Sequence, residues 1–109
     1  MKINGSFHFM KDNTGNLTGW FLHNHSISPA VTTAILNTPI SSNYIGTYSA
    51  QWNDGVQPLS TGILEISLKS NSTNIYELKW KSNNGKNKIF NGEGMLNTQQ
   101  NILVGWYEN

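Results

Sequence analysis

The stretch "IYELKWKSNNGKNKIFNGEG", residues 75–94, alternates apolar and charged side chains. In an extended chain, Tyr76, Leu78 and Trp80 point to one face and the charged residues between them point to the other. A period of two over this length is typical of a β-strand with one buried face. The chain therefore has to fold into a sheet whose large rings are gathered on one side.

Similar alternating runs recur along the chain, about every 10 to 14 residues, between clusters of Gly, Asn and Ser. This spacing predicts an all-β, mainly antiparallel single domain over 1–109, a small up-and-down β-barrel of about seven to eight strands. One of the predicted turns is "NDGVQP", at 53–58. The predicted strands cover 2–11, 16–24, 43–53, 61–70, 74–82, 87–96 and 101–108.

The segment "SISPAVTTAILNTP" departs from this pattern. Ser28 can serve as an N-cap with Pro29 at the first helical position, and Pro39 stops any continuation. These signals predict one short helix at 29–37, between an N-terminal hairpin at 2–24 and a five-strand meander at 43–108. Its β-branched residues make it a poor helix former.

The loop of the hairpin around Gly85 has two possible registers. A two-residue turn at Asn84 and Gly85 places Tyr76 opposite Glu93, on the aromatic face. A three-residue "NNG" loop with a left-handed Gly85 places Leu78 opposite Phe90 and Tyr76 opposite Gly92 instead. We prefer the second register, because a lone buried carboxylate costs several kcal/mol unless it is paired. Gly92 then faces inward, as does Gly94, so these positions serve either a tight barrel corner or a small cavity.

Two other segments carry large apolar side chains. The run "YIGTYSAQW" at 44–52 alternates aromatic and small residues on one face, as a closing barrel requires. In the first hairpin, apolar residues occupy both faces of the strand at 16–24, with Trp20 and Phe21 adjacent. Both sides of this hairpin should therefore be covered, by the 29–37 helix or by a second copy of the protein.

The composition of the 109-residue chain excludes several classes of protein. Cys is absent, so disulfides and Cys-ligated metal sites are excluded. The formal net charge is +1 and all seven basic residues are Lys, so no basic stripe for nucleic acid is expected. No apolar run is long enough for a membrane span, and the start does not resemble a signal peptide. We expect a cytoplasmic protein that binds neither nucleic acid nor membrane, with a processed secreted form still open.

From Ile45 onward, the segments "GTY...W", "G.LEI", "YELKW", "FNGEGML" and "ILVGWY" resemble the repeated hairpins of calycin-type barrels, the lipocalin and avidin-like group. Gly46 to Tyr48 stands where that group has its Gly-x-aromatic strand opening. The sequence departs from the lipocalin pattern at Tyr48, where a Trp is usual, and in the hairpin and helix that precede this region. The resemblance implies a barrel whose interior holds one small apolar ligand, and it implies no catalytic residue.

The predicted sites follow from this fold. Three imidazoles, His8, His23 and His25, are the candidates for a metal site, but no acidic residue stands near them as a supporting group, so we expect no metal and no cofactor. If the interior holds a ligand, the inward rings of the meander should line it. These rings are Tyr48, Trp52, Tyr76, Trp80 and Phe90.

The sequence leaves three functions open. The first is a non-enzymatic protein that binds a small apolar ligand or a protein partner and self-associates through its N-terminal hairpin. The second is a carbohydrate-binding module: Trp106 and Tyr107 are consecutive, so one faces outward, and an outward Trp106 could stack on a sugar ring. The third is a barrel-type cyclase or isomerase in which an inward Tyr donates a proton.

Overall fold

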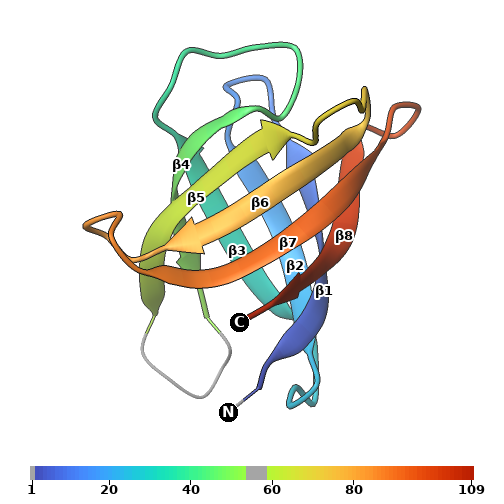
Figure 1. The fold of residues 1–109 in the computed structure, drawn as a ribbon. Helices are drawn as coiled ribbons and strands as arrows, with labels where there is room; N and C mark the ends of the chain where they lie inside the picture. Colours follow the sequence, from blue (N-terminus) through green and yellow to red (C-terminus); the bar gives the residue numbers. More distant parts are fainter. Residues whose placement is uncertain (1, 54–58) are drawn as a thin grey trace.

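The computed structural model describes residues 2–53 and 59–109, and in them the chain forms a closed antiparallel β-barrel (Figure 1). The turn predicted at 53–58 falls almost entirely outside these residues. The barrel has eight strands: β1 (Asn4–Lys11), β2 (Leu17–His23), β3 (Ala30–Leu36), β4 (Gly46–Trp52), β5 (Ser60–Leu68), β6 (Ile75–Lys81), β7 (Lys88–Asn97) and β8 (Ile102–Glu108).

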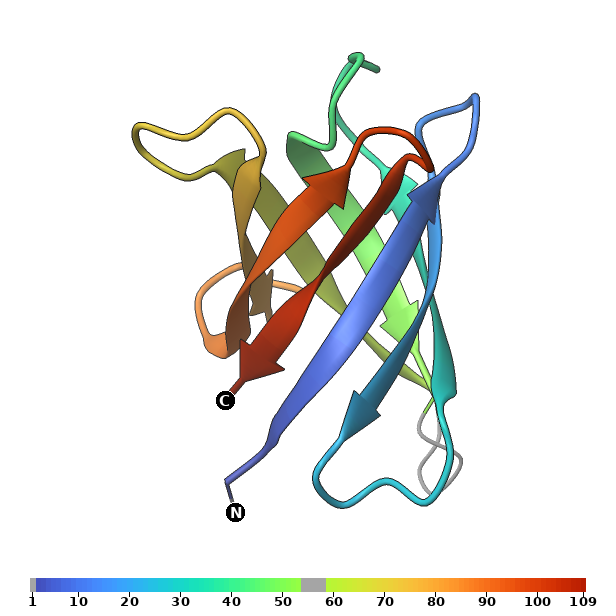
Figure 2. The same ribbon diagram turned by 90° about the vertical axis from the view of Figure 1, so that its right-hand side faces the viewer.

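Each strand pairs with the next along the chain, and β8 returns to pair with β1 (Figure 2). The closing pair runs from Asn4 opposite Glu108 to Met10 opposite Ile102. Closure removes the exposed strand edges that an open sheet of this size would present to other chains. The predicted all-β, up-and-down barrel is therefore confirmed, and seven of its eight strands lie close to the predicted positions.

The predicted helix at 29–37 is wrong, because residues 30–36 form strand β3. Thr32 and Ala34 point into the barrel and are buried, while Val31 and Ile35 are exposed on the outside. β-branched side chains have few rotamers in a helix and pack well on a pleated sheet, so the four of them in this segment favour the strand. The N-cap and proline signals mark the ends of β3 equally well.

The β6–β7 hairpin keeps the predicted faces but has a different register. Trp80 lies opposite Phe90 and Tyr76 opposite Gly94, so the pairing is shifted by two residues from the preferred alternative. The turn is longer than expected: the Ser82 amide donates to the Asn87 carbonyl, and an irregularity in the ladder follows Trp80. Because the shift is even, every side chain stays on its predicted face. Gly85 has the predicted left-handed conformation, with a φ of 74°.

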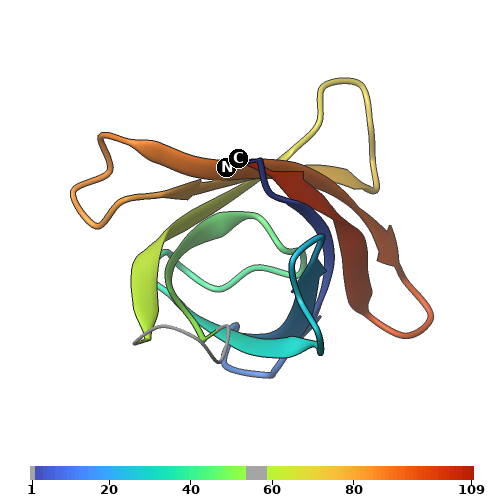
Figure 3. The same ribbon diagram turned by 90° about the horizontal axis from the view of Figure 1, so that it is seen from below.

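Charged side chains lie on the outside of the meander, as the alternation predicts. Glu65 lies opposite Lys79 and forms an ion pair with Lys81 at 3.0 Å, and Glu93 forms one with Lys69 at 3.0 Å. Figure 3 looks along the barrel from the end where both termini lie. The termini are joined there by a hydrogen bond of 3.0 Å from the Asn109 amide to the Ile3 carbonyl.

The opposite end of the barrel is filled by side chains. Tyr44 and Tyr48 are almost completely buried there, and the Tyr48 hydroxyl donates a hydrogen bond of 2.8 Å to the Tyr44 carbonyl. The Tyr44 hydroxyl in turn donates to the Asn101 carbonyl at 2.7 Å, which ties the β3–β4 connection to the β7–β8 turn. Leu17 and Leu103 are also buried at this end of the barrel. Among the described residues, no helix is long and apolar enough to cross a membrane.

Candidate functional site

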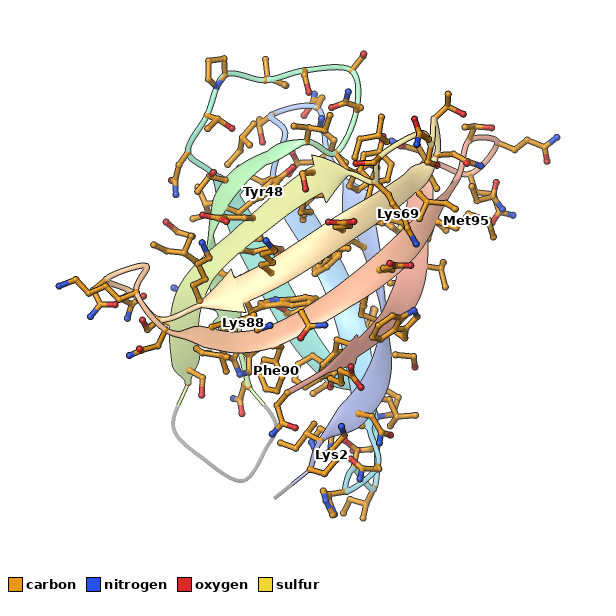
Figure 4. All side chains as sticks on the ribbon, viewed as in Figure 1. Lys2, Tyr48, Lys69, Lys88, Phe90 and Met95 are labelled. Carbon is orange, nitrogen blue, oxygen red and sulfur yellow. The ribbon has the colours of Figure 1, made fainter. Side chains whose placement is uncertain are left out.

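The interior is hollow at the end that carries the termini, where a cavity of about 80 Å³ remains. Its walls come from Ile3 and β1, from the starts of β3 and β7 and from the ends of β2, β4, β6 and β8. Figure 4 shows the two levels of the barrel, with Phe90 in the lower part of the view and Tyr48 in the upper part. The cavity is lined by Ile3, Phe7, Phe9, Phe21, His23, Thr32, Trp52, Trp80, Phe90 and Tyr107.

Aromatic rings form most of this lining, and they meet edge to face. Phe90 contacts three rings at the centre: Trp52 at 6.4 Å between centroids, Trp80 at 6.4 Å and Tyr107 at 5.4 Å, with interplanar angles of 72°, 87° and 85°. These angles and distances lie in the range that aromatic pairs prefer. The rings therefore hold each other in place around the hollow. Phe90 and Trp52 are only partly buried, so the cavity reaches toward solvent at this end of the barrel.

One residue of the cavity lining, Tyr107, carries a buried polar group with no hydrogen-bond partner in the described residues. Tyr107 is 6% exposed, and its hydroxyl is the only buried side-chain polar atom without a hydrogen-bond partner in the described residues. An unsatisfied buried hydroxyl costs about 1–3 kcal/mol, so it calls for an explanation. Burial raises the pKa of Tyr107 to about 12, so the group carries its proton at neutral pH and can donate.

Two further polar side chains line the cavity. The His25 amide donates to Nδ1 of His23 at 3.0 Å, so the neutral His23 ring carries its proton on Nε2. The Thr32 hydroxyl donates to the Gln51 carbonyl at 2.8 Å, which leaves its oxygen free only as an acceptor. Among the residues that the structure describes, the lining contains no Lys, Asp or Glu. The cavity is therefore apolar, with a few neutral hydrogen-bonding groups.

The structure separates the five rings predicted to line a pocket into two groups. Trp52, Trp80 and Phe90 line the cavity, whereas Tyr48 and Tyr76 point inward but are buried outside the cavity lining. The alternating pattern identified the inward face but not the height of each ring along the barrel axis. Sequence reasoning also missed Tyr107, although alternation in "ILVGWYE" places it on the same face as the buried Leu103.

The three histidines do not converge. His8 is on the outside of β1, opposite Trp20 on β2 and Val104 on β8. His23 and His25 are close to each other, with ring centroids 6.0 Å apart. Over residues 2–53 and 59–109, no group of three or more His, Cys, Asp and Glu side chains is arranged to hold a metal.

The outside of the barrel carries a row of mostly apolar, exposed side chains. On β7, β8, β1, β2 and β3, a single row of outward side chains crosses five neighbouring strands. The members of this row are Met95, Val104, His8, Trp20 and Val31. All four apolar members are between 45% and 60% exposed. We call this row, together with Met10, Leu22 and Trp106 beside it, the outer apolar face.

Trp106 is the outward member of the Trp106–Tyr107 pair and is 46% exposed. It lies opposite Ser6 on β1 and Glu93 on β7, beside a shallow depression over β1 that Leu22 and Asn24 also line. The small Ser6 side chain lies in this depression, between the large side chains of Leu22 and Trp106. Trp106 is therefore a half-exposed ring at the side of this depression.

Fold and site together define this chain as an eight-stranded closed antiparallel β-barrel with an aromatic cavity at one end. No family model, no curated protein and no solved structure matches it.

Proposed function

We propose that the protein binds a small apolar ligand in the cavity at the end of the barrel that carries the termini, as the resemblance to calycin-type barrels implies. The observation that carries this proposal is the contrast between the two ends of one interior. Buried tyrosines and leucines fill one end, while seven aromatic side chains at the other surround about 80 Å³ of unfilled space. Barrel cores are normally packed without such gaps, so the hollow supports binding.

The size of the cavity limits the ligand. An engineered apolar cavity that binds benzene has a volume of roughly 150 Å³, about twice the volume here. A ligand with a single ring therefore fits only if part of it remains in the mouth. Burial of roughly 150–200 Å² of ligand at about 25 cal/mol/Å² contributes about 4–5 kcal/mol. This corresponds to a Kd of roughly 0.1–1 mM for a simple probe, and the natural ligand should bind more tightly through its polar contacts.

Tryptophan fluorescence tests the proposal, because Trp52 and Trp80 line the cavity while Trp20 and Trp106 are on the outside. Titration with a one-ring probe such as acetophenone should quench the emission in a saturable manner. The same titration of Trp52→Phe and Trp80→Phe should show a smaller change, and Trp20→Phe serves as the matched control with an undiminished one. A response that does not saturate, or that depends only on Trp20, would rule out the cavity as the site.

We also propose that the outer apolar face binds a second copy of the protein. Its seven apolar side chains are each between 42% and 60% exposed and cover five neighbouring strands. A contiguous exposed apolar patch of this kind is typical of an interaction surface. The row from Met95 to Val31 contains no acidic residue and no lysine. Two copies can therefore meet without like-charge repulsion.

The geometry suits a two-fold interface. Trp20, on β2, points outward beside His8 of β1, and the depression over Ser6 lies on the same outer face. In an isologous dimer each copy can insert Trp20 into the depression of the other. Sedimentation velocity over a concentration series should show a dimer for the unchanged protein and a monomer for Val104→Lys. Ser67→Lys, on the charged outer side of β5, should remain dimeric.

Carbohydrate binding by Trp106 is the competing use of this face. If the unchanged protein stays monomeric in sedimentation up to millimolar concentration, the dimer proposal fails. A glycan array that then gives signals lost in Trp106→Ala would establish the sugar-binding alternative. Dimer formation with a blank array would eliminate it.

A further inference from the structure

The buried hydroxyl of Tyr107 narrows the chemistry of the ligand. Its ring is held on three sides, by Phe21 at 6.4 Å, Trp80 at 5.8 Å and Phe90 at 5.4 Å between centroids. This packing fixes the direction of the hydroxyl. Tyr107 lines the cavity, and its hydroxyl has no hydrogen-bond partner in the part of the chain that the structure describes.

We propose that the ligand is an uncharged, one-ring molecule that carries one hydrogen-bond acceptor, such as a carbonyl or ether oxygen, which accepts from the Tyr107 hydroxyl. This inference rests on the proposed function, since it requires that the cavity binds a ligand at all. The ring of the ligand contacts the edges and faces of the aromatic lining. Its acceptor reaches the Tyr107 hydroxyl, the one buried donor left unpaired among the described residues.

The absence of charge follows from the lining. None of its ten residues is Lys, Asp or Glu, and its other polar side chains are His23 and Thr32. A carboxylate or an ammonium group buried here would lose its hydration without gaining an ion pair, which costs several kcal/mol. A neutral oxygen has a small desolvation cost, because the hydrogen bond from the Tyr107 hydroxyl replaces the one it made to water.

The mouth adds a second contact. His23 is half-buried at the end of β2, and its Nε2 carries the proton of the neutral ring because Nδ1 accepts from the His25 amide. Nε2 is therefore a second neutral donor, closer to solvent than Tyr107. A ligand with a second oxygen on the part that remains in the mouth can use it.

Three probes of similar shape test this inference. Acetophenone has the carbonyl oxygen, α-methylstyrene replaces that oxygen by a methylene group, and benzoate has a carboxylate in its place. In fluorescence or calorimetric titrations, acetophenone should bind the unchanged protein and benzoate should bind at least about tenfold more weakly. Tyr107→Phe should weaken acetophenone about three- to tenfold, because one neutral hydrogen bond is lost, and leave α-methylstyrene unchanged or slightly tighter.

Tyr48→Phe is the matched control, since it removes a buried tyrosine hydroxyl at the filled end, outside the cavity lining. It should not change the preference between acetophenone and α-methylstyrene. If Tyr107→Phe affects both probes equally, or benzoate binds as well as acetophenone, this inference is wrong although the cavity still binds. If none of the three probes binds the unchanged protein at millimolar concentration, the proposed function itself fails.

Discussion

Trp80 on β6 and Phe90 on β7 lie directly opposite each other inside the barrel, and their rings meet at 87° with centroids 6.4 Å apart. Trp80 belongs to the buried core, since it is 7% exposed and its ring packs on Phe7. Phe90 is only partly buried and lines the cavity. This pair therefore connects the stability of the barrel to the shape of the proposed site.

Loss of the Trp80 ring should strongly destabilise the barrel. Trp80→Ala should lower the free energy of unfolding by about 3–5 kcal/mol, because a large buried ring is replaced by a cavity. In urea denaturation, a double-mutant cycle with Trp80→Leu and Phe90→Leu should give a coupling energy of about 0.5–1.5 kcal/mol for the edge-to-face pair. Ile35→Val, at an exposed position on the outside of β3, is the control and should change stability by less than about 0.5 kcal/mol. A coupling energy of zero would mean that the two rings do not interact as described.

The two substitutions Tyr107→Phe and Tyr48→Phe should differ in their effect on stability, although each removes one buried hydroxyl. Tyr107→Phe removes an unpaired buried hydroxyl, so the stability of the ligand-free protein should stay equal or rise by up to about 1 kcal/mol. Tyr48→Phe removes a made hydrogen bond and should lower stability by about 1 kcal/mol. Thermal or urea unfolding of both variants measures the difference. A clear loss of stability in Tyr107→Phe would show that its hydroxyl has a partner inside the protein.

Two glycines on the inner face of β7 should differ in tolerance to alanine. A Cβ at Gly92 would lie 2.0 Å from the Trp106 carbonyl oxygen, a backbone atom that cannot move without shifting β8. At Gly94 the nearest atoms belong to the Leu103 side chain, at 3.1 Å, which can adjust. Gly92→Ala should therefore cost about 3 kcal/mol or more and Gly94→Ala about 1 kcal/mol. Equal costs would be inconsistent with the close approach of β7 and β8 at Gly92.

Alkaline pH should destabilise the protein over a defined range. Burial raises the pKa of Tyr44, Tyr48 and Tyr107 to about 12, from about 10 in an unfolded chain. The fold favours the neutral phenols, so their contribution is fully present below about pH 10 and is lost as the pH rises to about 12. Urea midpoints should be flat from about pH 8 to 10 and fall above that, with phenolate absorbance appearing as the protein unfolds. Full ionisation of these tyrosines near pH 10 in the folded state would contradict their burial.

The strands and their faces could be predicted from the sequence because alternation depends only on neighbouring residues. Charged residues such as Glu77 and Lys79 between large rings leave one choice of inner face. The pairing of Trp80 with Phe90 could not be predicted, because it depends on the length of the turn that Ser82 and Asn87 close. The segment at 30–36 was misread because Pro29 and Pro39 can bound a strand as well as a helix.

The candidate site was predictable in part. Alternation identifies rings that point inward, and on that basis Trp52, Trp80 and Phe90 were correctly placed on the inner face. It does not give the height of a ring along the axis, so Tyr48 could not be distinguished from Trp52 four residues later on the same strand. The shift between neighbouring strands sets this height, and it emerges only when the barrel closes.

The central claim is that a small apolar molecule enters the hollow end of the barrel. Nuclear magnetic resonance of the four indole N–H groups during a titration with acetophenone tests it most directly, because two of them lie at the cavity and two on the outer face. The account predicts saturable shifts for Trp52 and Trp80 and unchanged positions for Trp20 and Trp106. Shifts confined to Trp20 and Trp106, or none at millimolar acetophenone, would contradict it.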